Sequence, residues 1–232
     1  MLRQLCLAAL ISLVAASAPA REIRFSGYSW LVRNSGGQTG GPGPNVFSGT
    51  PDAVDVLPDG SLRLSILKTG SGWSCAEVIL HQALGYGSYE IEVENNPADM
   101  DRQAVFGFFS YDSSPEQSHR ELDVELSYWG NPDDDRNSQF VVQPDRPGHK
   151  NRFVVKEPGT LYRIHWTRGV AEFTALSSDG SVLRHWVQRE AVPDAADARI
   201  DLNLWLAKGR PPQTGLNVEF VVKRFRFTPE SQ

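Results

Sequence analysis

Most of the chain alternates apolar and polar residues, which is the pattern of β-strands with one face in a core and the other toward solvent. Turn sequences such as Pro58-Asp59-Gly60 and Ser178-Asp179-Gly180 separate these stretches, and no stretch after residue 20 favours a helix. The segment from Gly36 to Gly43 is too rich in Gly and Pro for regular structure and predicts a long loop. Strands are expected at Ala53–Leu57, Ser61–Leu67, Tyr86–Glu94, Ala104–Tyr111, Arg120–Tyr128, Gln139–Val142, Asn151–Lys156, Leu161–Thr167, Val170–Leu176, Ile200–Leu206 and Asn217–Thr228. Short strands without repeats predict an all-β, antiparallel sandwich of the jelly-roll kind.

One strand combines this alternation with unusual chemistry. Residues two apart on a strand share a face, so Glu121, Asp123 and Glu125 are expected to project together. The apolar residues between them, Leu122, Val124 and Leu126, are expected in the core. On a concave strand, two Glu side chains leaning together could approach to roughly 5–6 Å, the spacing of retaining glycoside hydrolysis.

The pattern by itself does not separate catalysis from an ordinary strand. Glu90-Ile91-Glu92-Val93-Glu94 alternates in the same way, and there we expect a half-buried strand with a solvated face. The residues around each segment have to decide between the two readings.

The strand Ile200–Leu206 supplies such a context. Its leucines are expected in the core, which leaves Asp201, Asn203 and Trp205 on the opposite face. An aromatic plane beside an amide suits a sugar-binding cleft, because the ring stacks on a pyranose while the amide meets its hydroxyls. The alternative is that Trp205 packs under a neighbouring loop.

The remaining polar signals are weaker. His119 is in phase with Glu121 and could contact a sugar, although a lone His is more often structural. The five histidines show no metal-ligand spacing, and Pro132-Asp133-Asp134-Asp135 is more typical of a solvated turn than of a calcium loop. No metal and no cofactor are therefore expected.

The first twenty residues resemble a secretory signal. Arg3 is followed by an apolar run from Leu5 to Ala16, too short to span a bilayer, and by the small residues Ala18-Pro19-Ala20. Removal of residues 1–20 would leave 21–232 as one secreted or periplasmic domain, expected to be a monomer with no membrane span. Cys6 would leave with the signal, so Cys75 would be alone. The net charge of −5 argues against a nucleic-acid partner.

Five motifs occur in the order found in one family: Ser74-Cys75-Ala76-Glu77, Gly85-Tyr86-Gly87-Ser88-Tyr89-Glu90, Phe108-Phe109-Ser110-Tyr111, Glu121-Leu122-Asp123-Val124-Glu125 and Asn203-Leu204-Trp205. The chain resembles glycoside hydrolase family 16, and within it the bacterial β-1,3-1,4-glucanases (lichenases), over roughly Trp73 to Phe227.

The resemblance implies a concanavalin-A-like sandwich of two antiparallel sheets with a concave substrate cleft for a polysaccharide. It implies Glu121 as nucleophile, Glu125 as general acid/base and Asp123 as an assisting carboxyl between them. Further residues implied to contact the sugar are Glu77, Tyr111, Asn203 and Trp205.

Several positions depart from the lichenase pattern. His119-Arg120 stands where lichenases have Trp-Asp, Ile79 where they have Arg, and Val141 and Gln143 where they have Asn and Tyr. The disulfide partner of Cys75 is missing, and Val221 replaces a calcium-site Asp. These changes suggest retained chemistry on a different glycan, with loss of activity as an alternative.

The expected function is an exported retaining endo-glycosidase. A non-catalytic, lectin-like binding module on the same fold is one alternative, because a fold does not fix a function. A transglycosylase, in which a sugar hydroxyl replaces water, would use the same three carboxyls.

Overall fold

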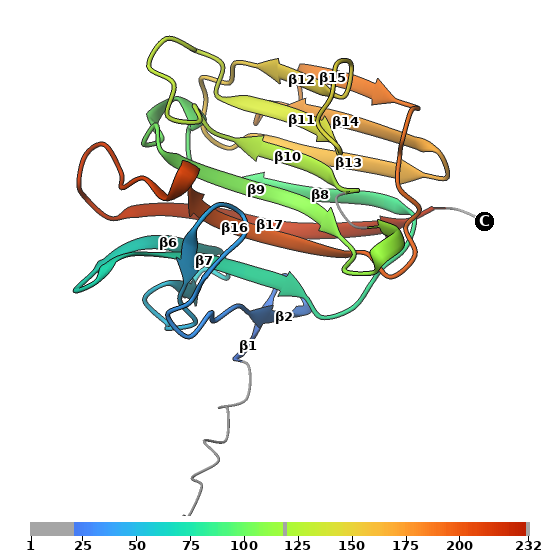
Figure 1. Cartoon of the computed structure of the whole chain (residues 1–232). Helices are drawn as coiled ribbons and strands as arrows, with labels where there is room; N and C mark the ends of the chain where they lie inside the picture. Colours follow the sequence, from blue (N-terminus) through green and yellow to red (C-terminus); the bar gives the residue numbers. More distant parts are fainter. Residues whose placement is uncertain (1–20, 118–119, 231–232) are drawn as a thin grey trace, which may run out of the picture.

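The computed structural model describes residues 21–117 and 120–230, and its regular structure is almost entirely β (Figure 1). The strands are β1 (Glu22–Phe25), β2 (Tyr28–Val32), β3 (Thr39–Gly40), β4 (Asn45–Phe47), β5 (Val54–Val56), β6 (Leu62–Thr69), β7 (Gly72–Leu80), β8 (Gly87–Val93), β9 (Ala104–Tyr111), β10 (Leu122–Leu126), β11 (Ser138–Val142), β12 (Lys150–Phe153), β13 (Leu161–Thr167), β14 (Val170–Leu176), β15 (Val182–Gln188), β16 (Arg199–Leu206) and β17 (Val218–Pro229). Three 3-10 turns complete the elements: η1 (Pro97–Asp99), η2 (Pro115–Gln117) and η3 (Ala207–Gly209).

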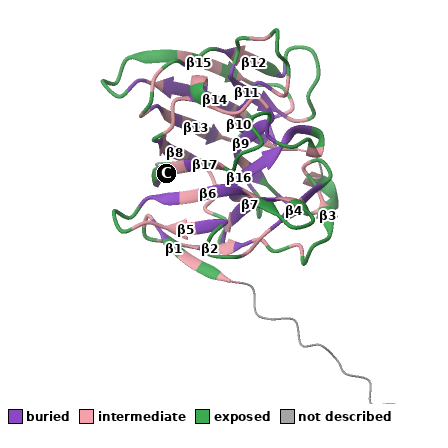
Figure 2. Cartoon of the chain, turned by 90° about the vertical axis from the view of Figure 1, so that its left-hand side faces the viewer, coloured by how far each residue is buried: buried purple, intermediate pink, exposed green. Residues whose placement is uncertain are grey.

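The strands form two layers, which Figure 2 shows side by side. Sheet 1 has the order β1-β2-β7-β16-β9-β10-β11-β12, and sheet 2 the order β5-β6-β17-β8-β13-β14-β15. All of these pairings are antiparallel. The β6–β7 hairpin connects the layers, and the short β3–β4 pair lies along β7, with β4 and β7 parallel. The expected jelly-roll sandwich is confirmed.

The core lies between the two sheets because each sheet turns its apolar positions inward. Phe106 on β9 and Phe220 on β17 stack across the layers with ring centroids 4.0 Å apart. Both rings are fully buried. Truncating one such ring to Ala typically costs about 3–5 kcal/mol, so contacts of this kind fix the distance between the layers.

Six strands of the structure were not expected from the pattern: β1, β2, β3, β4, β7 and β15. All of them except β7 are short or lie at a sheet edge. β7 was missed for a different reason: Ser74 to Val78 are all buried, so the strand shows no polar face and no alternation. A strand covered on both sides loses the period-two signal on which the expectation depended. The loop expected from Gly36 to Gly43 is present, apart from the two residues of β3.

The acidic strand of sheet 2 differs from its expectation. Glu90 does not lie on a solvated face: it is 6% exposed, and its carboxylate accepts hydrogen bonds from Arg163 and Arg226 at 2.6 and 2.9 Å. Glu92 pairs with Arg224 at 3.0 Å, and Glu94 alone is exposed. β8 lies between β13 and β17, whose arginines cover this face.

Among the described residues, no helix has the length and apolar character needed to cross a bilayer.

Candidate active-site cleft

Sheet 1 carries a cleft of about 720 Å³ on the face turned away from the core. The residues that line it come mainly from β7, β9, β10 and β16 and from the loops that follow β2 and β10. They are Arg33, Gly41, Pro42, Glu77, Ile79, Gly107, Phe109, Tyr111, Glu121, Asp123, Glu125, Trp129, Gln143, Arg199, Asp201, Asn203 and Trp205.

The three carboxyls of the β10 segment open into this cleft, as the alternation predicts. Leu122, Val124 and Leu126 are fully buried in the core behind them. Asp123 is 3% exposed, whereas Glu121 and Glu125 keep intermediate exposure to the cleft. The side-chain period of the strand therefore places three acids on one concave surface.

Strand register builds a row of polar side chains across the cleft. Glu125 on β10 lies opposite Gly107 on β9, which lies opposite Asn203 on β16, which in turn lies opposite Glu77 on β7. A side chain at Gly107 would have no room, because its Cβ would be 2.5 Å from Oδ1 of Asn203. The absence of a side chain at Gly107 makes room for the Asn203 amide between β9 and β7.

Glu77 is held by an arginine that the sequence did not indicate. Nη1 of Arg33, the residue after β2, donates to both carboxylate oxygens of Glu77 at 3.0 Å and to Gly41 O at 2.8 Å. Asn203 Nδ2 adds a hydrogen bond at 3.3 Å. Burial raises the pKa of Glu77, and the Arg33 charge and the Asn203 amide oppose that rise. Arg33 thus supplies a cation next to Glu77 although Ile79 supplies none.

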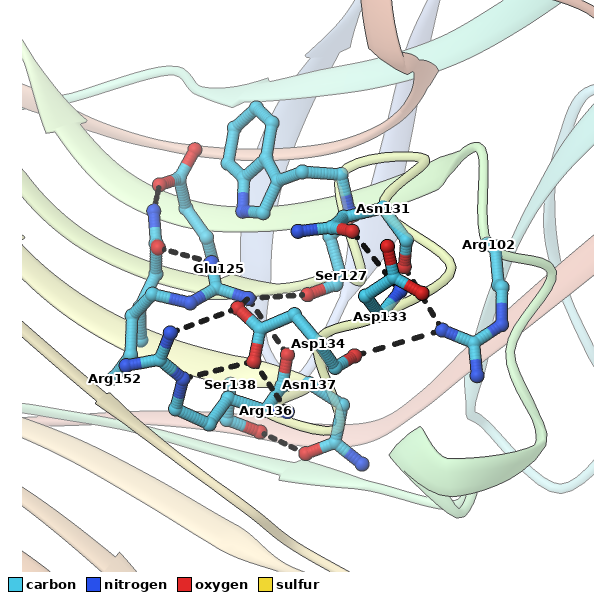
Figure 3. A network of polar contacts seen from close by, with 12 residues as sticks. Arg102, Glu125, Ser127, Asn131, Asp133, Asp134, Arg136, Asn137, Ser138 and Arg152 are labelled. Atoms are coloured by element: carbon cyan, nitrogen blue, oxygen red, sulfur yellow. Dashed lines mark hydrogen bonds and ion pairs between the residues drawn. The ribbon is translucent and has the colours of Figure 1, made fainter.

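Glu125 is the end of a polar network that reaches across β11 and β12 (Figure 3). Gln139 Nε2 donates to Glu125 Oε2 at 2.5 Å, and Arg152 Nη1 donates to Gln139 Oε1 at 2.7 Å. Arg152 is anchored by Arg136 O at 2.6 Å and by the Asp134 carboxylate at 3.3 Å. Each residue of this network positions the next, so the orientation of the Glu125 carboxyl is set by side chains on β11 and β12.

The environment of Glu125 favours its protonated form. Burial raises the pKa of Glu125 to about 7, and the charge of Glu121 acts in the same direction. The hydrogen bond from Gln139 and the charges of Lys150 and Arg152 oppose the rise. A carboxyl with such a pKa can both donate and accept a proton near neutral pH.

Asp123 lies deeper than its two neighbours. Gln143 Nε2 donates to its Oδ2 at 3.0 Å, while its buried Oδ1 has no hydrogen-bond partner within the described part of the chain. Burial raises the pKa of Asp123 well above its usual range, and the charges of Glu121 and Glu125 add to the effect. Asp123 therefore carries its proton more readily than a surface Asp and can share it with an adjacent carboxylate.

Aromatic side chains form the walls of the cleft. Trp205 and Trp129 meet edge to face with ring centroids 5.5 Å apart. Trp129 has a φ of 56°, a left-handed conformation that is costly for a bulky residue, and its amide N–H donates to Ser127 Oγ at 2.8 Å. Trp205 is only 8% exposed, and a Cβ at Gly43, in the Gly36–Gly43 loop, would lie 3.7 Å from its ring, whereas Tyr111 is 41% exposed. Trp205 therefore both lines the cleft and packs beside a loop, so the two expectations for it do not exclude each other.

The structure thus brings Glu77, Tyr111, Asn203 and Trp205 to the same cleft as the three β10 carboxyls. His119 lies outside the described residues. The sequence reasoning missed Arg33, Gln139 and the site position of Asp201. Asp201 was placed on the correct face by alternation, and Gln139 is in register with Glu125, so a strand-pairing argument could have found it.

Two expectations concern cysteine and metals. Cys75 is buried and unpaired, its Sγ lies 3.4 Å from Asn45 Oδ1, and burial raises the pKa of its thiol to about 12. Within 21–117 and 120–230, no group of three or more His, Cys, Asp or Glu side chains has an arrangement that could hold a metal ion. Asp134, in the acidic loop, forms ion pairs with Arg136 at 2.8 Å and with Arg152 at 3.3 Å.

No family model matches the chain, and no curated protein matches it. Its fold is nevertheless similar to that of solved glycoside hydrolases. A prokaryotic β-1,3-1,4-glucanase (lichenase) from a mouse hindgut metagenome has a TM-score of 0.63 and 20% identity, over 87% of this chain and 93% of that one. The β-glucanase of Bacillus licheniformis has a TM-score of 0.64 and 20% identity, over 93% and 100%.

A third similar structure is described as an immunostimulatory antigen and pseudo β-1,3-glucanase of Mycobacterium tuberculosis, with a TM-score of 0.64 and 18% identity, over 87% and 91% of the two chains. At these identities the likeness concerns the fold. The resemblance to lichenases drawn from the ordered motifs is confirmed at that level.

Proposed function

We propose that this chain belongs to glycoside hydrolase family 16 and cleaves β-glycosidic bonds within a polysaccharide, with retention of configuration. One observation carries the proposal: the three carboxyls at alternate positions of the segment Glu121–Glu125 open into one cleft, in which burial and the charge of Glu121 raise the pKa of Glu125 to about 7 while Gln139 fixes its orientation. Asn203 and Trp205, on β16 two strands away, offer an amide and an aromatic wall to a sugar ring.

In the proposed first step, a Glu121 carboxylate oxygen attacks the anomeric carbon and forms a glycosyl ester. The bond from that carbon to the glycosidic oxygen breaks, and the departing oxygen takes the proton of Glu125. In the second step Glu125, now a carboxylate, removes a proton from water as the water oxygen attacks the same carbon. The ester bond breaks, Glu121 returns as a carboxylate and Glu125 is protonated again.

Asp123 and Gln139 support these two residues. Asp123 lies between them and can share a hydrogen bond with Glu121 as its charge is lost and regained. Gln139 holds one oxygen of Glu125, which leaves the other oxygen to face the glycosidic bond. Neither residue needs to form a bond to the sugar for this role.

The test is release of reducing ends from a panel of β-glucans, β-galactans and bacterial envelope polysaccharides. We expect Glu121→Gln and Glu125→Gln each to lower kcat/KM by about 10³-fold or more. Glu94→Gln, an exposed acid of the other acidic strand, is the matched control and should leave activity unchanged. Absence of wild-type activity across the whole panel would contradict the proposal.

Stereochemistry tests the retaining mechanism separately. With an aryl glycoside, whose leaving group needs no acid, Glu125→Ala should form the glycosyl-enzyme but hydrolyse it slowly. Added azide should then restore turnover and yield a glycosyl azide of the same anomeric configuration as the substrate. A product of inverted configuration would exclude Glu121 as the nucleophile.

A non-catalytic carbohydrate-binding protein is the second candidate. It is supported by the likeness to a structure described as a pseudo β-1,3-glucanase and by the lichenase positions replaced here, Ile79, Val141 and Gln143. Calorimetry followed by mass spectrometry discriminates. Tight binding of an oligosaccharide that stays intact with the wild-type chain supports this candidate over the enzyme.

We also propose that the chain is exported and cleaved after Ala20, on the strength of the charged start, apolar run and small residues at its N-terminus. N-terminal sequencing of the protein from the periplasm or medium should begin at Arg21. An intact Met1 on protein retained in the cytoplasm would refute export.

A further inference from the structure

The cleft contains a buried acid that the proposed chemistry does not use. Asp201 on β16 is 5% exposed and lines the cleft floor, and its Oδ1 has no hydrogen-bond partner within the described residues. Its partners in register are Phe109 on β9 and Ile79 on β7, and both are apolar. A buried acceptor oxygen without a donor is costly, so the position of Asp201 Oδ1 suits a donor that comes from outside the chain.

The charge of the cleft points to what that donor is. The cleft is lined by five carboxyl groups and two guanidinium groups. One of the two guanidinium groups, that of Arg33, already pairs with Glu77. The other, Arg199, shares a strand face with Asp201 but forms no ion pair with it in the described structure. The cleft therefore has an excess of acid that its own cations do not balance.

A second acceptor lies beside Asp201 and is independent of the acids. Asn203 is 1% exposed, two residues along the same face of β16, and its Oδ1 has no hydrogen-bond partner among the residues described. Asp123 Oδ1, two strands away from Asp201 in the same row, is likewise unpartnered. A single hydroxyl offers one hydrogen to the neighbouring Oδ1 atoms of Asp201 and Asn203, whereas an ammonium offers three and can donate to both.

From this geometry we propose that Asp201 binds the ammonium group of an amino sugar, so that the cleft takes a β-linked glycan with free amino groups. Sugar ring and cation are then recognised together: Trp205 and Trp129 meet the ring, and Asp201 with Asn203 Oδ1 meets the charge. The inference rests on the proposed function only in placing a glycan in this cleft.

Binding should release a proton. Burial and the charges of Glu77 on β7 and Glu121 before β10 raise the pKa of Asp201 well above its usual range, while Arg199 on its own strand and Arg33 after β2 oppose this. From β9 the facing residue is Phe109, which carries no charge. An incoming ammonium stabilises the carboxylate, so Asp201 loses its proton as the ligand binds.

A matched set of probes tests the proposal. The β-1,4 hexasaccharides of glucosamine, glucose and N-acetylglucosamine differ only in the group on C2, which is an ammonium, a hydroxyl or an acetamide. Titration calorimetry on the full chain, at a pH where the amines are protonated, should give about tenfold or more tighter binding for the glucosamine oligomer. Buffers of different ionisation enthalpy should reveal the released proton.

Two variants and a control assign the effect to Asp201. Asp201→Asn should abolish both the preference for glucosamine and the proton release, so that the glucosamine and glucose oligomers bind alike. Ile79→Lys, which supplies a cation opposite Asp201, should also abolish the preference. Asp197→Asn, an exposed acid of a neighbouring hollow, should change neither quantity.

The outcomes are distinct from those of the function test. Failure of the glucosamine oligomer to bind, binding no tighter than that of the glucose oligomer, or a preference that survives in Asp201→Asn overturns the inference. If the chain releases reducing ends only from neutral glycans, the proposed function stands and the inference falls. If amino-sugar binding depends on Asp201 but no glycan is cleaved, the inference stands and the enzymatic function falls.

Discussion

Gln139 donates a hydrogen bond of 2.5 Å to Glu125, and the two residues face each other across the β10–β11 pair. The contact ties the proposed acid/base to a strand that the cleft itself does not include. Arg152 donates to Gln139 in turn, so the protonation of Glu125 depends on a residue that does not line the cleft.

The pH profile should respond to Arg152. Glu125 has to be protonated to assist the leaving oxygen, so activity falls as pH rises through its pKa of about 7. Arg152→Met removes a charge that favours the carboxylate and releases Gln139, so the pKa of Glu125 rises. The falling limb of kcat/KM against pH should move to higher pH, whereas its rising limb should stay in place.

Arg136→Met is the control for this shift. Arg136 pairs with Asp134 but its side chain does not contact Gln139, so its loss should leave the limb where it is. An Arg152→Met profile that superimposes on that of the wild type would rule out the network as a determinant of Glu125 ionisation.

Gly107→Ala should damage both stability and activity. The added Cβ would lie 2.5 Å from Asn203 Oδ1 and displace that amide from the position in which it donates to Glu77. Overpacking of this kind costs about 1–3 kcal/mol, and kcat/KM should fall by about tenfold as the polar row is disturbed. Urea unfolding and kinetics measure the two effects. Gly70→Ala, with nothing within 4 Å of its Cβ, should leave both near wild type.

Arg33 and Glu77 should prove coupled. Arg33→Met leaves the Glu77 carboxyl buried without its cation, and because Arg33 is itself 27% exposed we expect a loss of about 1–3 kcal/mol. The double variant Arg33→Met/Glu77→Gln removes the uncompensated charge and should recover part of that loss. A double-mutant cycle by urea denaturation measures the coupling, and additive single effects would show that the pair contributes no mutual stabilisation.

Asp201→Asn should stabilise the protein at neutral pH. The pKa of Asp201 is raised in the folded state, so above pH 4 the unfolded chain loses this proton before the folded chain does. Stability then falls as pH rises from the unfolded pKa toward the folded one, and Asn removes that loss. The variant should have a higher melting temperature than wild type near pH 7, by about 2–4 °C for each kcal/mol gained in the free energy of unfolding. The difference should be smaller near pH 4.

Asp179 should affect the pH dependence of stability in the opposite direction, because its pKa is lowered in the folded state. Hydrogen bonds from Ser177 and Ser181 lower its pKa to about 2, so the group contributes stability above the unfolded pKa that is lost as pH falls toward 2. Asp179→Asn should therefore not raise the melting temperature at neutral pH. Equal shifts in both variants would point to a general effect of charge removal.

The acidic alternations show how far the strand pattern reaches. Both Glu121–Glu125 and Glu90–Glu94 have the pattern of strands with an acidic face, and each lies in a strand except for one terminal Glu. Only the pairing partners separate them: Arg163 and Arg226 cover Glu90, whereas Phe109, Gly107 and Asn203 leave the other acids open to the cleft. Partners across strands are not encoded in a local period, so the pattern could not have made this distinction.

The sequence by itself determined the sandwich, the inward leucines of β10 and β16 and the outward faces of Glu121, Asp123, Glu125, Asp201, Asn203 and Trp205, because the side-chain period of a strand is a local property of the backbone. Tertiary structure decided the rest. Arg33 reaches Glu77, Gln139 reaches Glu125 and Asp201 is paired with apolar residues on both neighbouring strands because of the register between strands distant in sequence. Register follows from the packing of the whole sandwich, and no short segment contains it.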